Sequence, residues 1–179
     1  DELNVCVCLA RLGRDAAWAS VLPSGPLGDV VRSCAADAGV KMEHVVTDQD
    51  GEVGCYFVLP KEKRTFFQRS NSSFHKQRHG LFDWQAMLAE RTSSGARAWL
   101  HMTGISPMLG ADASSSWSAA IRAAFSAGIP ISVDLNHRPQ LGTLAQLWSI
   151  IEPAVPSIQL LILSAHSAQG LLDLLGLEV

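Results

Sequence analysis

Short apolar runs alternate along this chain with longer stretches in which apolar residues recur every three or four positions. The short runs are typical of buried strands, and the longer stretches are typical of helices that bury one face. Strands that alternate with helices form right-handed βαβ units, and these build a parallel sheet covered by helices. The sequence therefore predicts an α/β fold. The expected strands are residues 16–22, 98–102, 131–133 and 158–163, and the expected helices are residues 5–12, 27–38, 117–125, 144–151 and 168–175.

The length and composition of the chain fit one domain, or most of a somewhat larger one. The sequence has 179 residues, of which 47% are hydrophobic and 17% are charged, against about 25% charged residues in an average globular protein. This composition supplies a real core and excludes disorder. A net charge of -3 with scattered basic residues argues against nucleic-acid binding. The longest aliphatic stretch, residues 158–163, is too short to cross a bilayer and is expected to be a buried strand.

The cysteines indicate a reducing, cytoplasmic compartment. Cys6, Cys8, Cys34 and Cys55 stand among apolar residues without the regular spacing of a disulfide-stapled secreted domain, so we expect packed thiols. The chain begins with DELN, and neither an initiator methionine nor a signal segment is visible. We therefore expect a chain that is cut at its start.

Two apparent ligand motifs do not hold. His75 and His79 have the spacing of a helical zinc site, but the intervening glutamate is absent and two cations stand between them. The glycines at residues 25–28 do not match the common phosphate-binding patterns, and helix initiation explains them more simply. The sequence therefore predicts no metal site.

One stretch breaks the alternation of strands and helices. Residues 53–59 and 64–69 are two β-type runs, and the four residues PKEK between them are too few for a helical crossover. We expect an antiparallel hairpin that projects from the sheet as a lid. The lid consists of residues 47–73 and is inserted in a single truncated α/β domain of residues 1–179. The strand edges of such a lid could pair with a second subunit, so a homo-oligomer formed through the lid is possible.

The hairpin carries Tyr56, Phe67 and Arg69. Two aromatic faces and a guanidinium could cover a sugar-like or carboxylate-bearing ligand. Spacing alone favours the alternative, in which the aromatic side chains pack inward and the arginine faces water.

Polar side chains follow two of the expected strands, where open parallel sheets collect their ligands. Residues 103–107 read TGISP, and residues 134–139 read DLNHRP. The second segment offers hydrogen-bond donors and acceptors for a polyhydroxylated ligand. A solvated loop in which Asp134 pairs with Arg138 is the alternative.

Three segments together resemble the ribokinase-like (PfkB) carbohydrate kinases. They are residues 4–13, with Asn-Val and Leu-Ala-Arg-Leu-Gly, residues 100–107 (LHMTGISP) and residues 133–138 (VDLNHR). The resemblance runs in order across essentially the whole chain and is specific as a set. It is closest to the 2-keto-3-deoxygluconate kinases, with the fructokinases next. The fold that it implies is a sheet flanked by helices, with a small β lid over the sugar.

The resemblance implies an ATP- and Mg²⁺-dependent kinase that phosphorylates a small sugar or sugar acid, with 2-keto-3-deoxygluconate as the expected acceptor. Phe67 stands where the family usually has a tyrosine, which removes one hydroxyl contact. Two arginines suit a sugar acid, because a guanidinium can bind a carboxylate through two hydrogen bonds. Fructokinases share the arginine at 138, so that residue alone does not select the acceptor. The implied acceptor-binding residues are Asp1, Asn4, Tyr56, Phe67, Arg69, Ile105, Asn136 and Arg138.

The chain departs from the family pattern in three places. Residues 23–28 keep only the last glycine of the usual G-x-D-x-x-G turn, and residues 164–168 (SAHSA) replace an acid-rich N/S-x-x-E stretch. The G-A-G-D segment, which supplies the family's catalytic aspartate and part of its ATP site, is not present in the 179 residues. We therefore expect no catalytic residue in this segment and no activity of the segment alone. A fructokinase and a kinase-derived binding or scaffold protein remain as alternatives.

Overall fold

The computed structural model describes residues 1–177, with the exception of residues 79, 94 and 96. The chain divides into two compact units, Asp1–Gln77 and Arg78–Val179. The structure defines the arrangement within each unit. The expectation of a single domain with an inserted lid stays a prediction.

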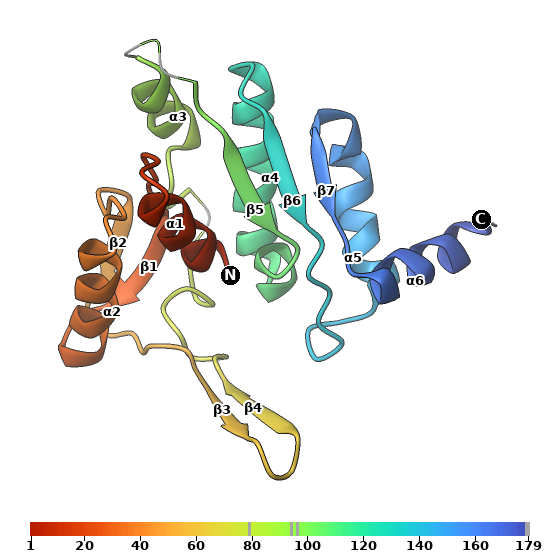
Figure 1. The fold of residues 1–179 in the computed structure, drawn as a ribbon, viewed down its shortest axis with the longest axis horizontal. Helices are drawn as coiled ribbons and strands as arrows, with labels where there is room; N and C mark the ends of the chain where they lie inside the picture. The colour runs from red at the N-terminus through yellow and green to blue at the C-terminus, as the bar shows by residue number, and fades with distance from the viewer. Residues whose placement is uncertain (79, 94, 96, 178–179) are drawn as a thin grey trace. The chain divides into compact units, whose positions relative to one another are not determined.

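The first unit combines a parallel strand pair, its helices and a hairpin (Figure 1). β1 and β2 run in parallel, with Ser20 opposite Val45. β3 and β4 are antiparallel and form a sheet of their own, which confirms the predicted hairpin. The elements are α1 (Glu2–Arg11), β1 (Ser20–Pro23), α2 (Pro26–Asp37), β2 (Val45–Asp48), β3 (Cys55–Leu59) and β4 (Arg64–Gln68).

Two glycines, Gly25 and Gly28, shape the turn from β1 into α2, and Gly28 is the one kept from the family pattern. Gly25 has a φ of 90°, a conformation that favours glycine, and turns the chain into the helix. A Cβ atom on Gly28 would overlap the carbonyl oxygen of Pro23. Only glycine therefore lets the first turn of α2 lie this close to the end of β1.

The second unit is built on a three-stranded parallel sheet in the order β5-β6-β7. Leu100 of β5 lies opposite Ile131 of β6, and Ser132 of β6 lies opposite Leu160 of β7. The predicted strands and helices of this half are confirmed, with shifted ends. The elements are α3 (Trp84–Thr92), β5 (Leu100–Thr103), the 3₁₀ helix η1 (Ser106–Leu109), α4 (Ala111–Ser126), β6 (Ile131–Asp134), α5 (Leu144–Ile151), the 3₁₀ helix η2 (Glu152–Ser157), β7 (Leu160–Ile162) and α6 (Ala165–Leu175).

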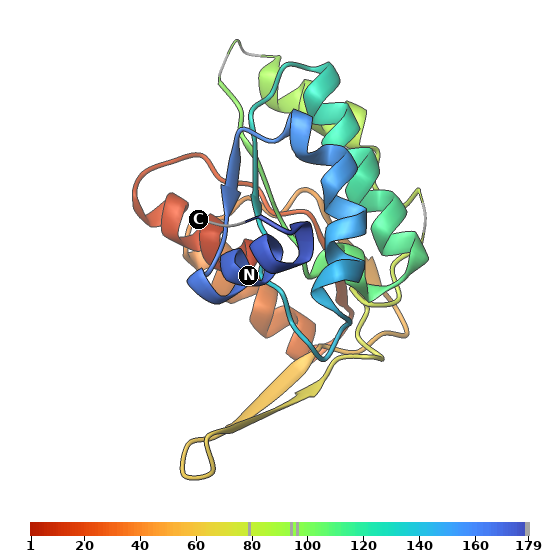
Figure 2. The same ribbon diagram turned by 90° about the vertical axis from the view of Figure 1, so that its right-hand side faces the viewer.

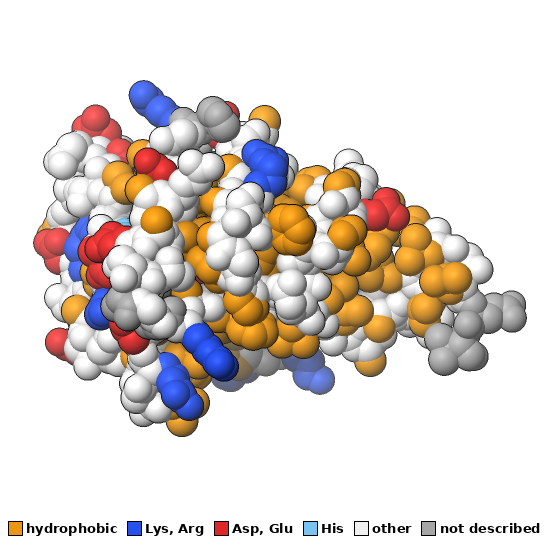
Figure 3. Space-filling model, turned by 90° about the horizontal axis from the view of Figure 1, so that it is seen from above, with side chains coloured by type: hydrophobic (Ala, Val, Ile, Leu, Met, Phe, Trp, Pro, Cys, Tyr) orange, Lys and Arg blue, Asp and Glu red, His pale blue; other side chains and the backbone are white. Residues whose placement is uncertain are grey.

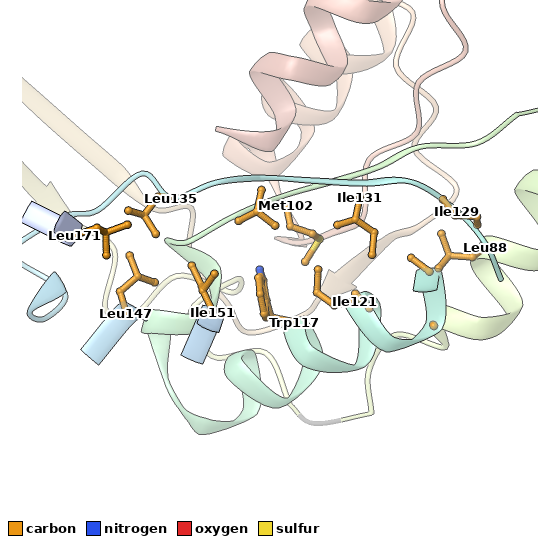
Figure 4. Packing of buried hydrophobic residues seen from close by; sticks show 14 residues of the cluster. Leu88, Met102, Trp117, Ile121, Ile129, Ile131, Leu135, Leu147, Ile151 and Leu171 are labelled. Carbon is orange, nitrogen blue, oxygen red and sulfur yellow. The ribbon is translucent and has the colours of Figure 1, made fainter. Parts of the chain in front are cut away.

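The core of the second unit lies between this sheet and the helices α4 and α5, which cover the same side of it (Figure 2). Figure 4 shows side chains of both helices pointing at the strands, with Trp117 below Met102. The alternation of the strands sends every second residue into this layer. Its largest fully buried side chains are Trp117, Ile131, Leu135, Leu147, Ile151 and Val133.

The last strand is more exposed than the sequence suggested. Leu161 packs against the core, but Leu160 and Ile162 point the other way and are exposed. β7 ends the strand order, so it has one neighbouring strand among the described residues. The expectation of a buried strand over residues 158–163 was wrong, because burial depends on the position of a strand in its sheet. Hydrophobic side chains predominate at the end of the chain that holds β7 and α6 (Figure 3).

The structure shows the state of the four cysteines and the length of the helices. All four thiols are free; Cys6 and Cys55 are half-buried, whereas Cys8 and Cys34 are exposed. The expectation of packed thiols was therefore wrong for the last two, which lie on outward faces of α1 and α2. Among the described residues, every helix is too short or too polar for a bilayer span.

Candidate functional site

The hairpin brings together the three lid residues that the sequence singled out. Tyr56 and Phe67 are direct partners across the two strands, with ring centroids 6.2 Å apart and an interplanar angle of 38°. The Cζ atom of Arg69 lies 4.5 Å from the centroid of the Phe67 ring. Side chains two residues apart share a face of a strand, so all three belong to one face. We call this the tyrosine face.

The tyrosine face is open to solvent and carries the Arg69 guanidinium, which is stacked on Phe67. Tyr56 and Phe67 are exposed, while Arg69 is half-buried. The alternative in which the aromatic rings pack inward is therefore wrong. A guanidinium stacked on a ring keeps its N–H groups directed sideways, where they can meet a planar anion. The face suits a ligand that has both apolar carbon atoms and a carboxylate.

Asp1 and Asn4 lie in the same unit, at the amino end of α1. Asp1 is the N-cap residue, and Asn4 follows within the first turn. Residues three apart share a helix face. Both residues are exposed.

In the second unit, the two segments beyond the strand ends lie side by side. Thr103 and Asp134 are register partners at the ends of β5 and β6. The backbone N–H of Gly104 donates to the carbonyl oxygen of Asp134 at 2.8 Å. A Cβ atom on Gly104 would overlap the carbonyl oxygen of Leu135. Glycine at 104 thus allows the turn that carries half-buried Ile105 to approach the loop after β6.

The loop after β6 is shaped by its own side chains. The Oδ1 atom of Asp134 accepts the backbone N–H of Asn136 at 3.0 Å. Asn136 has a φ of 41°, a left-handed conformation that asparagine tolerates better than most residues. The Nε2 atom of His137 lies 2.9 Å from the carbonyl oxygen of Gly142. These bonds fix the backbone on both sides of Arg138.

The expected alternative of an Asp134–Arg138 ion pair is not formed within the described part of the chain. The carboxylate of Asp134 instead binds the loop backbone. Arg138 is exposed, and its Nη1 atom reaches the carbonyl oxygen of His137 at 3.5 Å. The guanidinium therefore faces solvent at the carboxyl end of the sheet.

Two positioning residues escaped the sequence reasoning. Gly104 and Asp134 are not among the implied acceptor-binding residues, yet they set the two segments against each other. The D-x-N pattern, in which an aspartate accepts the N–H two residues later, was a readable signal for the second. No sequence signal marks the approach of Gly104 to Leu135, because these residues are distant in the chain.

The described residues contain no cluster of metal-ligand side chains. No group of three or more His, Cys, Asp or Glu side chains within them could hold a metal ion, and His79 of the rejected zinc motif lies outside the described residues. At the start of α6, Ser164 acts as the N-cap and accepts the backbone N–H of Ser167 at 3.1 Å. The stretch that departs from the acidic family pattern is thus a helix cap.

The structure is an α/β protein with polar loops after β5 and β6 and a separate antiparallel hairpin. The profile described as pfkB family carbohydrate kinase matches residues 1–171. The chain therefore belongs to the pfkB family of carbohydrate kinases.

Individual relatives agree with this assignment. The 2-dehydro-3-deoxygalactonokinase of Haloferax volcanii is 27% identical over 179 residues, which cover 98% of this chain and 54% of the relative. The crystal structure of 2-dehydro-3-deoxygluconokinase from Thermotoga maritima has a TM-score of 0.84 and 28% identity, with 99% of this chain and 52% of that chain covered. Fructokinase from Xylella fastidiosa with bound ATP has a TM-score of 0.81 and 25% identity, with 98% and 53% covered. The chain thus spans about half the length of these relatives.

Proposed function

We propose that this chain is the acceptor-binding portion of an ATP-dependent kinase for a 2-keto-3-deoxy sugar acid, such as 2-keto-3-deoxygluconate. The observation that carries the proposal is the stacked guanidinium of Arg69 on Phe67, beside Tyr56. A neutral sugar has no group that uses a fixed cation so well, whereas a carboxylate can accept two of its hydrogen bonds. The names of the Thermotoga and Haloferax relatives, which are kinases of 2-dehydro-3-deoxy sugar acids, support the same acceptor class.

In this proposal each unit carries its own candidate acceptor contacts. Arg69 pairs with the carboxylate, and the aromatic rings of the tyrosine face cover the carbon chain. Asn136 and Arg138 bind hydroxyl or keto oxygens at the end of the sheet, and Ile105 forms a wall next to them. Asp1 and Asn4 bind further hydroxyl groups from α1. The hydroxyl that Phe67 lacks, compared with a tyrosine, weakens one contact without removing the cation.

Phosphoryl transfer belongs, in this proposal, to the longer protein. The reaction needs a base at the attacking hydroxyl and positive groups around the γ-phosphate. ATP would supply the transferred group. The 179-residue chain alone is expected to show no ATP-dependent turnover, and turnover by that polypeptide would refute this part.

The acceptor class is tested by Arg69→Ala in the complete protein. If Arg69 binds a carboxylate, Arg69→Ala should lower kcat/KM for 2-keto-3-deoxygluconate. The loss should correspond to about 2–5 kcal/mol of transition-state stabilisation. The loss for fructose, which has no carboxylate, should be much smaller. Arg91→Ala, which removes an arginine of α3 outside the proposed site, is the matched control. Equal losses for the acid and the neutral ketose would contradict the assignment and favour a fructokinase.

A second candidate is a kinase-derived binding protein that has lost catalysis. The helix cap at residues 164–168, which contains no carboxylate, favours it. Acceptor binding without turnover by the complete protein, measured by calorimetry and by a coupled kinase assay, would identify this case.

A further inference from the structure

A hollow lies between the start of α3 and one face of α4, two helices that run side by side in the second unit (Figure 2). Its volume is about 420 Å³, which is within the range of small-molecule sites. The lining residues of α4 are three or four positions apart, so they share one face of that helix; they are Ala119, Arg122, Ala123 and Ser126. The residues proposed to bind the sugar acid take no part in this hollow.

The floor of the hollow is apolar and held in place. The rings of Phe82 and Trp84 lie with their centroids 5.2 Å apart at an interplanar angle of 43°. The Nε1 atom of Trp84 donates to Oγ of Ser116 at 3.1 Å, which ties the indole to α4. Ala119 is half-buried and Ala123 is buried, and their methyl groups leave the space above them open. This floor suits a ring or another bulky apolar group.

The rim of the hollow carries two opposite charges. Asp83 and Arg122 are both exposed, and neither takes part in an ion pair within the described part of the chain. The Oδ1 atom of Asp83 accepts the backbone N–H of Ala86 at 3.0 Å, which fixes the direction of the carboxylate. The guanidinium of Arg122 is outside the hydrogen bonds formed among the described residues, so its N–H groups stay available to a ligand. One hollow thus offers a carboxylate, a guanidinium and an aromatic floor.

We propose that this hollow binds a free α-amino acid with a bulky apolar side chain. The carboxylate of the amino acid accepts hydrogen bonds from Arg122, its ammonium group donates to Asp83, and its side chain lies on Phe82 and Trp84. A simple anion would be attracted by Arg122 but repelled by Asp83, and a simple cation would meet the reverse. A zwitterion is the small ligand that both charges attract.

The hollow is open to solvent on the side of its charged rim, so binding is expected to be weak. At the lower end of the binding energy per atom that small ligands reach, L-phenylalanine should have a Kd on the order of 1 mM. A complex of this strength is best followed by a signal from a residue inside the hollow. The indole N–H of Trp84 is such a signal, because its hydrogen bond to Ser116 lies beside the proposed ring position.

The first test follows the indole N–H signals of the ¹⁵N-labelled 179-residue chain during a titration with L-phenylalanine. The chain has five tryptophans, and Trp84→Phe identifies the Trp84 signal by its loss. The Trp84 signal should shift and saturate with a Kd on the order of 1 mM. A signal that does not move up to about twenty times that concentration would overturn the proposal.

Two analogues of the probe each remove one charge. 3-Phenylpropionate lacks the ammonium group, and 2-phenylethylamine lacks the carboxylate. Each should bind at least about fivefold more weakly than L-phenylalanine, because one charged hydrogen bond is lost and one repulsion is left. Equal affinity of either analogue would show a site for a simple anion or a simple cation, and would overturn the assignment to an amino acid.

Two variants connect each ligand charge to its residue. Asp83→Asn keeps the helix cap, because asparagine caps helices as well as aspartate does. It should weaken L-phenylalanine about fivefold but should not weaken 3-phenylpropionate, which has no ammonium group. Arg122→Gln should weaken L-phenylalanine similarly but should not weaken 2-phenylethylamine.

Asp112→Asn is the matched control, since it removes an exposed acid from the first turn of α4 outside the hollow. It should leave all three affinities unchanged. The dispersion of the indole signals shows that each variant is folded. Equal losses for all three ligands in Asp83→Asn or Arg122→Gln, or the same losses in the control, would contradict the assigned contacts.

Discussion

The contact between Gly104 and Leu135 leads to a prediction that reverses a common rule. Replacing glycine with alanine usually stabilises a protein by about 0.4–1 kcal/mol where the backbone permits it, because the unfolded chain loses freedom. Gly104 is not among the glycines with positive φ, so its backbone suits alanine. The obstacle is steric: the new Cβ would overlap the Leu135 carbonyl oxygen and lie 3.1 Å from Cδ1 of Leu147.

The expected magnitude follows from these neighbours. The carbonyl oxygen belongs to the backbone after β6 and cannot rotate away, and Leu147 is a buried core residue. Overpacking of this kind costs about 1–3 kcal/mol. After the gain from the unfolded state, Gly104→Ala should destabilise the chain by roughly 1–2 kcal/mol, which lowers Tm by about 2–8 °C in a chain of this size.

The assay is urea unfolding, with Gly170→Ala as the matched control. In α6 the added Cβ would meet only Cδ2 of Leu144, at 2.8 Å, the end of a side chain that can turn. Alanine inside a helix is favoured over glycine, so this variant should be about 0.5–1 kcal/mol more stable than the wild type, less whatever Leu144 costs to turn. If Gly104→Ala were as stable as Gly170→Ala, the close approach of the two segments would be refuted.

Two further predictions concern a loop and a thiol. Asp134→Ala removes the acceptor for the Asn136 N–H and should cost about 0.5–1.5 kcal/mol in urea unfolding, whereas Asp134→Asn keeps an acceptor oxygen and should cost less; equal costs would contradict the turn. Burial, and next the Glu2 carboxylate, raise the pKa of the Cys6 thiol. Its reactive thiolate should therefore form only at higher pH, and mass spectrometry should find iodoacetamide on exposed Cys8 before Cys6. Glu2→Gln should speed the labelling of Cys6. An unchanged labelling rate would contradict a contribution of the Glu2 carboxylate to the raised pKa.

The sequence predicted best what depends on local periodicity. The helix at 117–125 and the hairpin have clear signals, namely an apolar stripe and a connection too short for a crossover. The strand β2 was missed because VVTD is too short to show alternation. The helix α3 was missed because its apolar side chains form only a weak stripe, although Asp83 gives it an N-cap that accepts the Ala86 N–H.

The sequence likewise predicted the parts of the candidate site that depend on strand parity, but not those that depend on packing. The shared face of Tyr56, Phe67 and Arg69 follows from strand parity once the hairpin is recognised. The stacking of the guanidinium on one particular ring does not, because it depends on side-chain rotamers. The tight approach of Gly104 to Leu135, and the exposure of β7, depend on which strands become neighbours. That information lies in the packing of distant segments, and no short window of sequence contains it.

Tyr56 is the single tyrosine of the chain, and it stands on the open face of the hairpin. Biosynthetic incorporation of fluorotyrosine would consequently give one ¹⁹F resonance, without any mutation and without a crowded spectrum. The chemical shift of that nucleus would report directly on whatever settles over its ring.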